Sequence, residues 1–282
     1  MSDRPILHHF EASPFSEKIR VVFGYKRIAW HSVLIPRILP KPDLIPLTGG
    51  YRRTPVMQIG ADIFCDTQMI TRVLVFFQNT VNLVFGSLGD KVPQDFIDDR
   101  TKMRGAPFDV KAMAAGLPQH RDQFRAHVAL IEDQLAGAGS ARPWLLGDFS
   151  LADINAYMNV WYVRSNLESA DALLAEFPHV RDWESRIRAI GHGTRTELSP
   201  QEALDIAANG TPAAAPASDE RDPGGRKVGD KVSVAADDYG KTEIEGEIVS
   251  LSDQHIAIRR RDGRVGEVTV HFPRAGYVVR AR

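Results

Sequence analysis

Ser13-Pro14-Phe15-Ser16 follows a short strand-like run at residues 6–10 and opens a helix. Ser13 carries the hydroxyl that favours a helix N-cap, and Pro14 takes the first helical position, where its missing N–H costs nothing. Apolar residues then recur at i, i+4, i+7 and i+8, which predicts one buried helix face. They are Phe15, Ile19, Val22 and Phe23.

The second informative stretch is Arg53-Thr54-Pro55-Val56, which Asp66-Thr67 follows. Four elements are predicted around it: a strand at 30–35, a proline-rich loop with at most a short helix at 36–46, and hairpin strands at 56–59 and 63–65. A helix resumes at Thr67. The order β-α-β-α-β-β-α is that of a thioredoxin-like α/β domain, which we assign to residues 1–82.

The rest of the chain changes character twice. Residues 88–208 show only helical periodicity and predict an all-α domain, with clear stripes such as Phe124, Val128, Ile131 and Leu135. Residues 209–225 lack periodicity and are rich in Ala, Pro and Gly, which predicts a flexible linker. Five short alternating strands then predict a small all-β barrel at residues 226–282.

Composition sets broad limits on function. The apolar share of 43% is ample for a core, and a net charge of −1 gives no reason to expect a polyanionic partner. The single cysteine, Cys65, excludes an intrachain disulfide and a multi-cysteine metal cluster. No apolar run has the length of a signal peptide's core or of a membrane span, so we expect a soluble, cytoplasmic protein without a membrane partner.

Three features could form a site for a small peptide thiol. Ser13 at a helix N-terminus could stabilise a thiolate through a donated hydrogen bond and the helix dipole, or it could be only an N-cap. Pro55 would present neighbouring main-chain groups to a peptide if its bond is cis, or it could be an ordinary loop proline. Asp66 and Thr67 offer a carboxylate for an ammonium group and a helix N-terminus for a carboxylate, or they could only cap a helix.

Longer runs make a resemblance specific. Residues 47–55 read Leu-Thr-Gly-Gly-Tyr-Arg-Arg-Thr-Pro, residues 144–154 read Trp-Leu-Leu-Gly-Asp-Phe-Ser-Leu-Ala-Asp-Ile, and residues 177–183 read Phe-Pro-His-Val-Arg-Asp-Trp. Together with the Ser13 motif, these runs resemble bacterial glutathione transferases over residues 4–208. In the second run, Ser150 and Asp153 have the spacing of a structural capping box.

The resemblance implies roles for individual residues. Ser13 matches the catalytic serine or cysteine. The residues that would hold glutathione are Thr54, Pro55 and Val56 for its cysteinyl unit, Asp66 and Thr67 for its γ-glutamyl unit, and Arg53, or else Arg52, for its glycyl carboxylate. The family implies a homodimer that uses glutathione as co-substrate, needs no metal and acts on a small electrophile.

Departures from the family narrow the chemistry. Asp66 is one methylene shorter than the usual Glu, and Phe10 lies near the position where other classes have a catalytic tyrosine. No cysteine occurs in the Ser13 motif, which disfavours disulfide reduction. We therefore expect a glutathione S-transferase that activates the thiolate for attack on a small apolar electrophile, with isomerisation and dehalogenation as other reactions of the same thiolate. The alternative is a non-catalytic glutathione-binding or scaffold protein whose barrel binds a protein or a nucleic acid.

Some reactive residue types have simpler interpretations. His8 and His9 are neighbours on a strand and point to opposite faces, so they cannot chelate one ion together. Cys65 reads as a small core residue. The Arg259-Arg260-Arg261 run hints at nucleic acid, but residues 226–282 carry eleven Lys or Arg against nine Asp or Glu, a weak net charge for that role.

Overall fold

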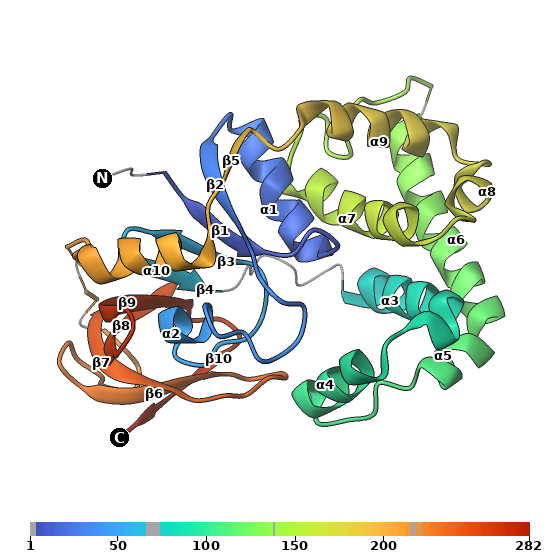
Figure 1. Ribbon diagram of the computed structural model, residues 1–282. Helices are drawn as coiled ribbons and strands as arrows, with labels where there is room; N and C mark the ends of the chain where they lie inside the picture. The colour runs from blue at the N-terminus through green and yellow to red at the C-terminus, as the bar shows by residue number, and fades with distance from the viewer. Residues whose placement is uncertain (1–3, 66–73, 138, 215–217, 220) are drawn as a thin grey trace.

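A computed structural model describes residues 4–65, 74–137, 139–214, 218–219 and 221–282. Figure 1 shows an α/β region in blue, a group of helices in green to yellow, and a set of strands in orange to red. This arrangement confirms the predicted fold class. None of the helices in the described ranges is both long and apolar enough to cross a membrane.

The α/β region has the predicted thioredoxin-like order. Its elements are β1 (Ile6–His9), α1 (Pro14–Tyr25), β2 (Ala29–Leu34), α2 (Ile45–Thr48), β3 (Val56–Ile59), β4 (Asp62–Cys65) and α3 (Leu74–Leu88). β1 pairs in parallel with β2 and antiparallel with β3, and β3 pairs antiparallel with β4. The register sets His8 opposite Val56 and Val56 opposite Cys65. The turn after β1, the loop before β3 and the end of β4 therefore lie at the same end of the sheet, where β1 and β4 finish and β3 begins.

The helical region packs against α1 through its own core. Its elements are the 3₁₀ helix η1 (Gly89–Lys91), α4 (Gln94–Arg104), α5 (Val110–Ala115), α6 (Leu117–Ala136), α7 (Leu151–Asn166), α8 (Ala170–Leu174) and α9 (Pro178–Ile190). The last helix, α10 (Pro200–Asn209), lies against β2 and β9 instead. The stripe predicted on α6 is buried in this core, together with Trp183 and Ile187 of α9. One short strand, β5 (Thr194–Glu197), interrupts the helices and pairs with β2. Its Thr-Arg-Thr-Glu sequence has no helical periodicity, and the edge of β2 supplies its partner.

Five strands follow at the C-terminal end, as predicted. They are β6 (Lys231–Ala236), β7 (Ile244–Leu251), β8 (His255–Asp262), β9 (Gly266–Pro273) and β10 (Tyr277–Ala281). They pair in the order β10-β6-β7-β8-β9, each antiparallel to its neighbour. We call residues 226–282 the C-terminal β domain and keep the division of the chain at these bounds as a proposal.

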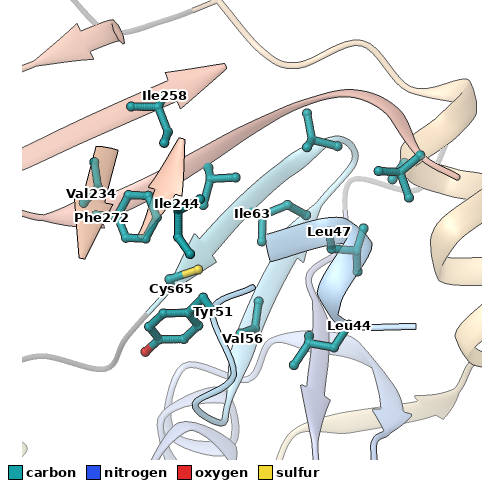
Figure 2. Close-up of a cluster of buried hydrophobic side chains, with 14 of the residues drawn as sticks. Leu44, Leu47, Tyr51, Val56, Ile63, Cys65, Val234, Ile244, Ile258 and Phe272 are labelled. Carbon is teal, nitrogen blue, oxygen red and sulfur yellow. The ribbon is translucent and has the colours of Figure 1, made fainter. Parts of the chain in front are cut away.

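The outer edge of β9 pairs in parallel with β4, which joins all ten strands into one sheet. Buried side chains of both regions meet in one hydrophobic cluster: Figure 2 shows Leu47, Val56 and Ile63 facing Ile244 and Phe272. Helix α10 adds Ala203, Leu204 and Ala207 to the same cluster. The C-terminal β domain is therefore packed against the thioredoxin-like region as part of a shared core.

Candidate functional site

Ser13 caps α1 from the turn after β1. Its Oγ accepts a hydrogen bond from the Ser16 N–H at 3.2 Å, and its main-chain N–H donates to the Phe10 carbonyl at 3.1 Å. Among the described residues no acceptor is found for the Ser13 hydroxyl proton. The residue is 2% exposed. Its geometry thus satisfies the structural role of an N-cap and leaves one O–H donor at the positive end of a helix.

A buried ionic network fixes α1 against β1 behind this turn. Arg20 donates from Nε to Glu17 at 3.0 Å and from one terminal nitrogen to His9 Nδ1 at 3.0 Å. The Nε2–H of His9 then donates to Ser32 Oγ at 2.9 Å. Burial and the Arg20 cation lower the pKa of His9 from 6.5 to about 3, so the ring is neutral and the network is fixed in one arrangement.

The other strand histidine also has a structural partner. His8 Nε2 lies 2.8 Å from Gln58 Oε1, and burial lowers the pKa of His8 to about 4. In the part of the chain that the structure describes, no group of three or more His, Cys, Asp or Glu side chains is placed to hold a metal ion.

The Thr54–Pro55 peptide bond is cis, as the resemblance implies. It precedes Val56, the first residue of β3, at the same end of the sheet as the Ser13 turn. The Thr54 main-chain N–H and C=O make no hydrogen bond within the described residues. A half-buried main chain with unpaired groups can accept an extended peptide as an additional strand.

The sequence did not predict a role for Lys41, whose side chain binds the loop that ends in Thr54–Pro55. Its Nζ donates to the Arg52 carbonyl at 3.0 Å and to Thr54 Oγ1 at 3.1 Å. Burial, with the nearby Arg100 and Arg52 cations, lowers the pKa of Lys41 from 10.5 to about 7. The only sequence signal is a lysine between two prolines, Pro40 and Pro42, in a loop whose path no periodicity reveals.

Arg52 and Arg53 differ in their surroundings. Arg52 pairs with Asp99 of α4. Arg53, like Arg52 a predicted partner of the glycyl carboxylate, pairs with the Asp238 carboxylate and the Tyr239 carbonyl in the loop between β6 and β7. Its guanidinium carbon lies 4.1 Å from the centre of the Tyr239 ring. The C-terminal β domain thus holds one of the predicted glutathione-binding residues.

The same loop also reaches α4. Gly240 donates its N–H to the Met103 carbonyl at 2.9 Å, and Figure 1 shows the β6–β7 loop extending toward that helix. The candidate site is therefore bordered by three elements: the loop that ends in Thr54–Pro55, helix α4, and the β6–β7 loop.

Other predicted residues fall in different places. Asp66 and Thr67 lie outside the described residues. Cys65 is 3% exposed within the shared core. Ser150 and Asp153 form the capping box of α7, in which Asp153 Oδ2 accepts from the Ser150 N–H at 3.0 Å.

The arginine run at residues 259–261 and Arg264 serve mainly internal contacts. Arg260 donates to the Pro46 carbonyl at 2.6 Å, and Arg264 donates to the Pro42 carbonyl at 2.5 Å and to Asp43 at 2.9 Å. Two of these arginines therefore tie the C-terminal β domain to the α2 region. Arg259 pairs with Glu247, and Arg261 lies 3.5 Å from Glu267.

Comparisons with known proteins agree with this arrangement. Two family models match, "Glutathione S-transferase, N-terminal domain" over residues 7–76 and "Glutathione S-transferase, C-terminal domain" over residues 114–186. The crystal structure of a GST-like protein from Pseudomonas syringae is 34% identical, with a TM-score of 0.78 and 100% of each chain covered. That match extends through the C-terminal β domain. No curated protein matches the chain.

Two further solved structures share less. FzlA from C. crescentus is 22% identical with a TM-score of 0.42, covering 76% of this chain and 96% of its own. Poplar glutathione transferase F1 is 15% identical with a TM-score of 0.47, covering 66% of this chain and 92% of its own.

Proposed function

Because this chain belongs to the glutathione S-transferase family, we propose that it binds glutathione and activates the thiol for attack on a small apolar electrophile. The observation that carries the proposal is the Ser13 hydroxyl. It occupies the N-terminus of α1, and its proton has no acceptor among the described residues. A hydroxyl in this position can donate to a thiolate, and the helix dipole adds to its stabilisation.

The main chain beside Ser13 would orient the peptide. The cysteinyl unit of glutathione would pair with the main-chain N–H and C=O of Thr54, which make no hydrogen bond among the described residues, and would lie against Pro55 and Val56. Such pairing would bring the sulfur near the N-terminus of α1, because the turn after β1 and the loop before β3 lie at the same end of the sheet. Asp66 and Thr67 would take the γ-glutamyl group.

Charge supports an anionic peptide. Three arginines lie around the loop, Arg52, Arg53 and Arg100, with Lys41 protonated only in part at neutral pH because its pKa is about 7. The acidic partners there are Asp99 and Asp238. Glutathione carries two carboxylates and one ammonium group, so a cationic surplus favours its binding. The glycyl carboxylate would meet Arg53.

The reaction follows from the activated sulfur. The thiolate attacks an electrophilic carbon, an S–C bond forms, and the electron pair leaves with the departing group or remains on an acceptor atom of an unsaturated substrate. Ser13 keeps its own proton throughout, because it acts as a hydrogen-bond donor. Isomerisation and dehalogenation would use the same thiolate. We also propose a cytoplasmic homodimer, which is the usual state of the family.

The second candidate is a non-catalytic glutathione-binding protein. The observation that favours it is the 2% exposure of Ser13, whose oxygen already serves as an N-cap. In this case glutathione would bind at Thr54 without a change in its thiol pKa.

A matched pair of variants separates the two functions. Ser16 lies one turn along the same helix, is fully buried, and its Oγ has no hydrogen-bond partner among the described residues, so Ser16→Ala is the control. Conjugation of glutathione to a chromogenic aryl halide would be measured beside calorimetric titration of glutathione. We expect Ser13→Ala to lower kcat/KM by about 10²-fold with little change in binding, which is the cost of one transition-state donor.

An equal rate in Ser13→Ala and the wild type would remove Ser13 from the mechanism. Binding without turnover in the wild type would favour the second candidate. No glutathione binding at all would overturn both.

A further inference from the structure

A cavity of about 460 Å³ lies where the C-terminal β domain joins the thioredoxin-like region. Its walls come from β4, β8 and β9 and from the chain that follows α10. We call it the junction pocket. Its polar lining includes Asp62, His271 and His255, none of which belongs to the candidate glutathione site. Pockets of this size hold small organic ligands.

These three side chains form one continuous hydrogen-bonded chain. His271 Nε2 lies 3.0 Å from Asp62 Oδ1, and His271 Nδ1 lies 2.8 Å from His255 Nε2. The second oxygen of Asp62 accepts from the Ala213 N–H at 2.8 Å. Since β4 carries Asp62 and the C-terminal β domain carries both histidines, the chain exists only because β4 pairs with β9.

The carboxylate fixes the direction of this chain. An aspartate at neutral pH can only accept, so His271 Nε2 must carry the proton that it shares with Asp62. With that proton on Nε2, the Nδ1 of His271 can accept from His255 Nε2–H. The remaining nitrogen of His255, Nδ1, is consequently left with a lone pair.

That outer nitrogen is open to a ligand. His255 Nδ1 has no hydrogen-bond partner within the described residues, and it is not among the buried polar atoms there that lack a partner, so it is not fully buried. Burial of the ring and the neighbouring His271 lower the pKa of His255 from 6.5 to about 4, so the ring is neutral at physiological pH. It therefore presents an acceptor to the pocket.

The remaining walls are suited to a flat apolar molecule. The rings of Phe64 and His271 stack with centroids 4.5 Å apart and planes 17° apart. The His255 ring lies edge to edge with His271, because the two rings share a hydrogen bond between their nitrogens, and their planes differ by 25°. Ala213 and Ala214 add small apolar side chains. A ligand ring can pack against this aromatic and apolar lining.

Charge excludes an anionic ligand. Neither lysine nor arginine is among the lining residues, and the one charged group is the Asp62 carboxylate. Both Asp62 oxygens already accept hydrogen bonds, so the carboxylate has little to offer a cation. A neutral ligand with one hydrogen-bond donor fits this lining.

We infer that the junction pocket binds a small neutral aromatic molecule with one weakly acidic hydroxyl, a phenol, whose O–H donates to His255 Nδ1. Its donor approaches in the plane of the His255 ring, and its own ring lies against the apolar lining side chains of the pocket. This site is separate from the glutathione site, and its occupation does not depend on the proposed transferase activity.

Two probes of equal ring size test the inference on the intact protein by ¹⁹F NMR. 4-Fluorophenol has the required donor, whereas 4-fluoroanisole has a methyl group in its place. We expect wild-type protein to bind 4-fluorophenol at least about fivefold more tightly than 4-fluoroanisole, the usual effect of one net hydrogen bond. Equal affinities, or no binding of 4-fluorophenol, would overturn the inference without any variant.

A variant then locates the binding. His255→Phe keeps an aromatic ring at the pocket wall and removes the acceptor. His127→Phe makes the same change on α6, where His127 stacks on Phe76. We expect His255→Phe to weaken 4-fluorophenol binding by about fivefold or more and to leave 4-fluoroanisole binding unchanged. His127→Phe should change the binding of neither probe. Unchanged 4-fluorophenol binding in a folded His255→Phe would place the phenol elsewhere and refute the site. Circular dichroism checks the fold of both variants.

Discussion

Ser13 and its neighbours combine a structural and a chemical task in one turn. The Ser13 oxygen accepts from the Ser16 N–H, so part of its hydrogen-bonding capacity serves the helix. The proton on the same oxygen is left for a ligand. An N-cap and a thiolate donor are therefore compatible roles, because they use different lone pairs and protons of one hydroxyl.

Arg53 has an acidic partner before any ligand arrives, and this leads to a prediction about affinity. The Asp238 carboxylate would compete with the glycyl carboxylate of glutathione for the same guanidinium. We expect Asp238→Asn to tighten glutathione binding by up to about fivefold, since Asp238 is half exposed and such pairs contribute little. Titration calorimetry of both proteins measures the change. Unchanged affinity would mean that Arg53 serves only the contact with the C-terminal β domain.

Lys41 gives a pH-dependent prediction. Its pKa falls from 10.5 in the unfolded chain to about 7 in the folded protein, so between these values the folded state binds fewer protons. Its contribution to stability is therefore complete above pH 10.5 and is lost as the pH falls toward 7. Urea unfolding near neutral pH, and again about two pH units higher, should show a larger gain in stability for the wild type than for Lys41→Met. Parallel pH profiles would show that Lys41 keeps its proton throughout.

Asp153 connects three elements of the helical region. It is fully buried and accepts from the Leu145 N–H at 2.9 Å, the Trp183 indole N–H at 2.9 Å, and both the N–H and the hydroxyl of Ser150. One carboxylate thus fixes the start of α7, the preceding loop and α9. Its role extends well beyond the predicted capping box.

This network predicts unequal costs for two substitutions. Asp153→Ala leaves three N–H donors without this partner, two of them buried, and should lower the free energy of unfolding by about 3 kcal/mol or more. Ser150→Ala removes only the cap and should cost about 1 kcal/mol. Urea denaturation of the two variants compares them. If both lose the same stability, the bonds from Leu145 and Trp183 contribute nothing.

Two glycines explain part of the Leu47–Pro55 motif. A Cβ on Gly49, which has φ of 73°, would lie 2.8 Å from both Ile244 and Arg260, and a Cβ on Gly50 would lie 3.1 Å from Thr242. These neighbours all belong to the C-terminal β domain. The glycines allow the α2 region to approach that domain closely, a reason that the resemblance alone does not provide.

The ten-stranded sheet joins the thioredoxin-like region and the C-terminal β domain through one core, although their sequences suggest separate domains. Ile258 of β8 and Ile63 of β4 belong to one core, so a cavity in either region should weaken both. We expect Ile258→Ala to cost about 2–5 kcal/mol and to raise amide hydrogen exchange in β3 and β4 as well as in the C-terminal strands. Mass spectrometry resolves these segments. Faster exchange confined to residues 226–282 would instead identify an independently folding domain.

Local patterns account for what could be predicted. The Ser13 cap, the thioredoxin-like order, the stripe on α6 and the five C-terminal strands all follow from spacing within about twenty residues. The pairing of β4 with β9, the contact of Arg53 with Asp238 and the chain from Asp62 to His255 each join residues about 185 to 210 positions apart. No periodicity specifies such contacts. They arise when two sheet edges meet, and they place the C-terminal β domain beside the candidate glutathione site.

The most direct test of the central claim is the ionisation of glutathione bound to the protein. Ultraviolet absorbance of the thiolate would be followed against pH with wild-type protein, Ser13→Ala and Ser16→Ala, each saturated with glutathione. We predict that wild type and Ser16→Ala lower the thiol pKa from about 8.5 toward neutrality, and that Ser13→Ala returns it most of the way. The same lowered pKa in Ser13→Ala, or an unshifted pKa in wild-type protein with glutathione bound, would contradict thiolate activation by Ser13.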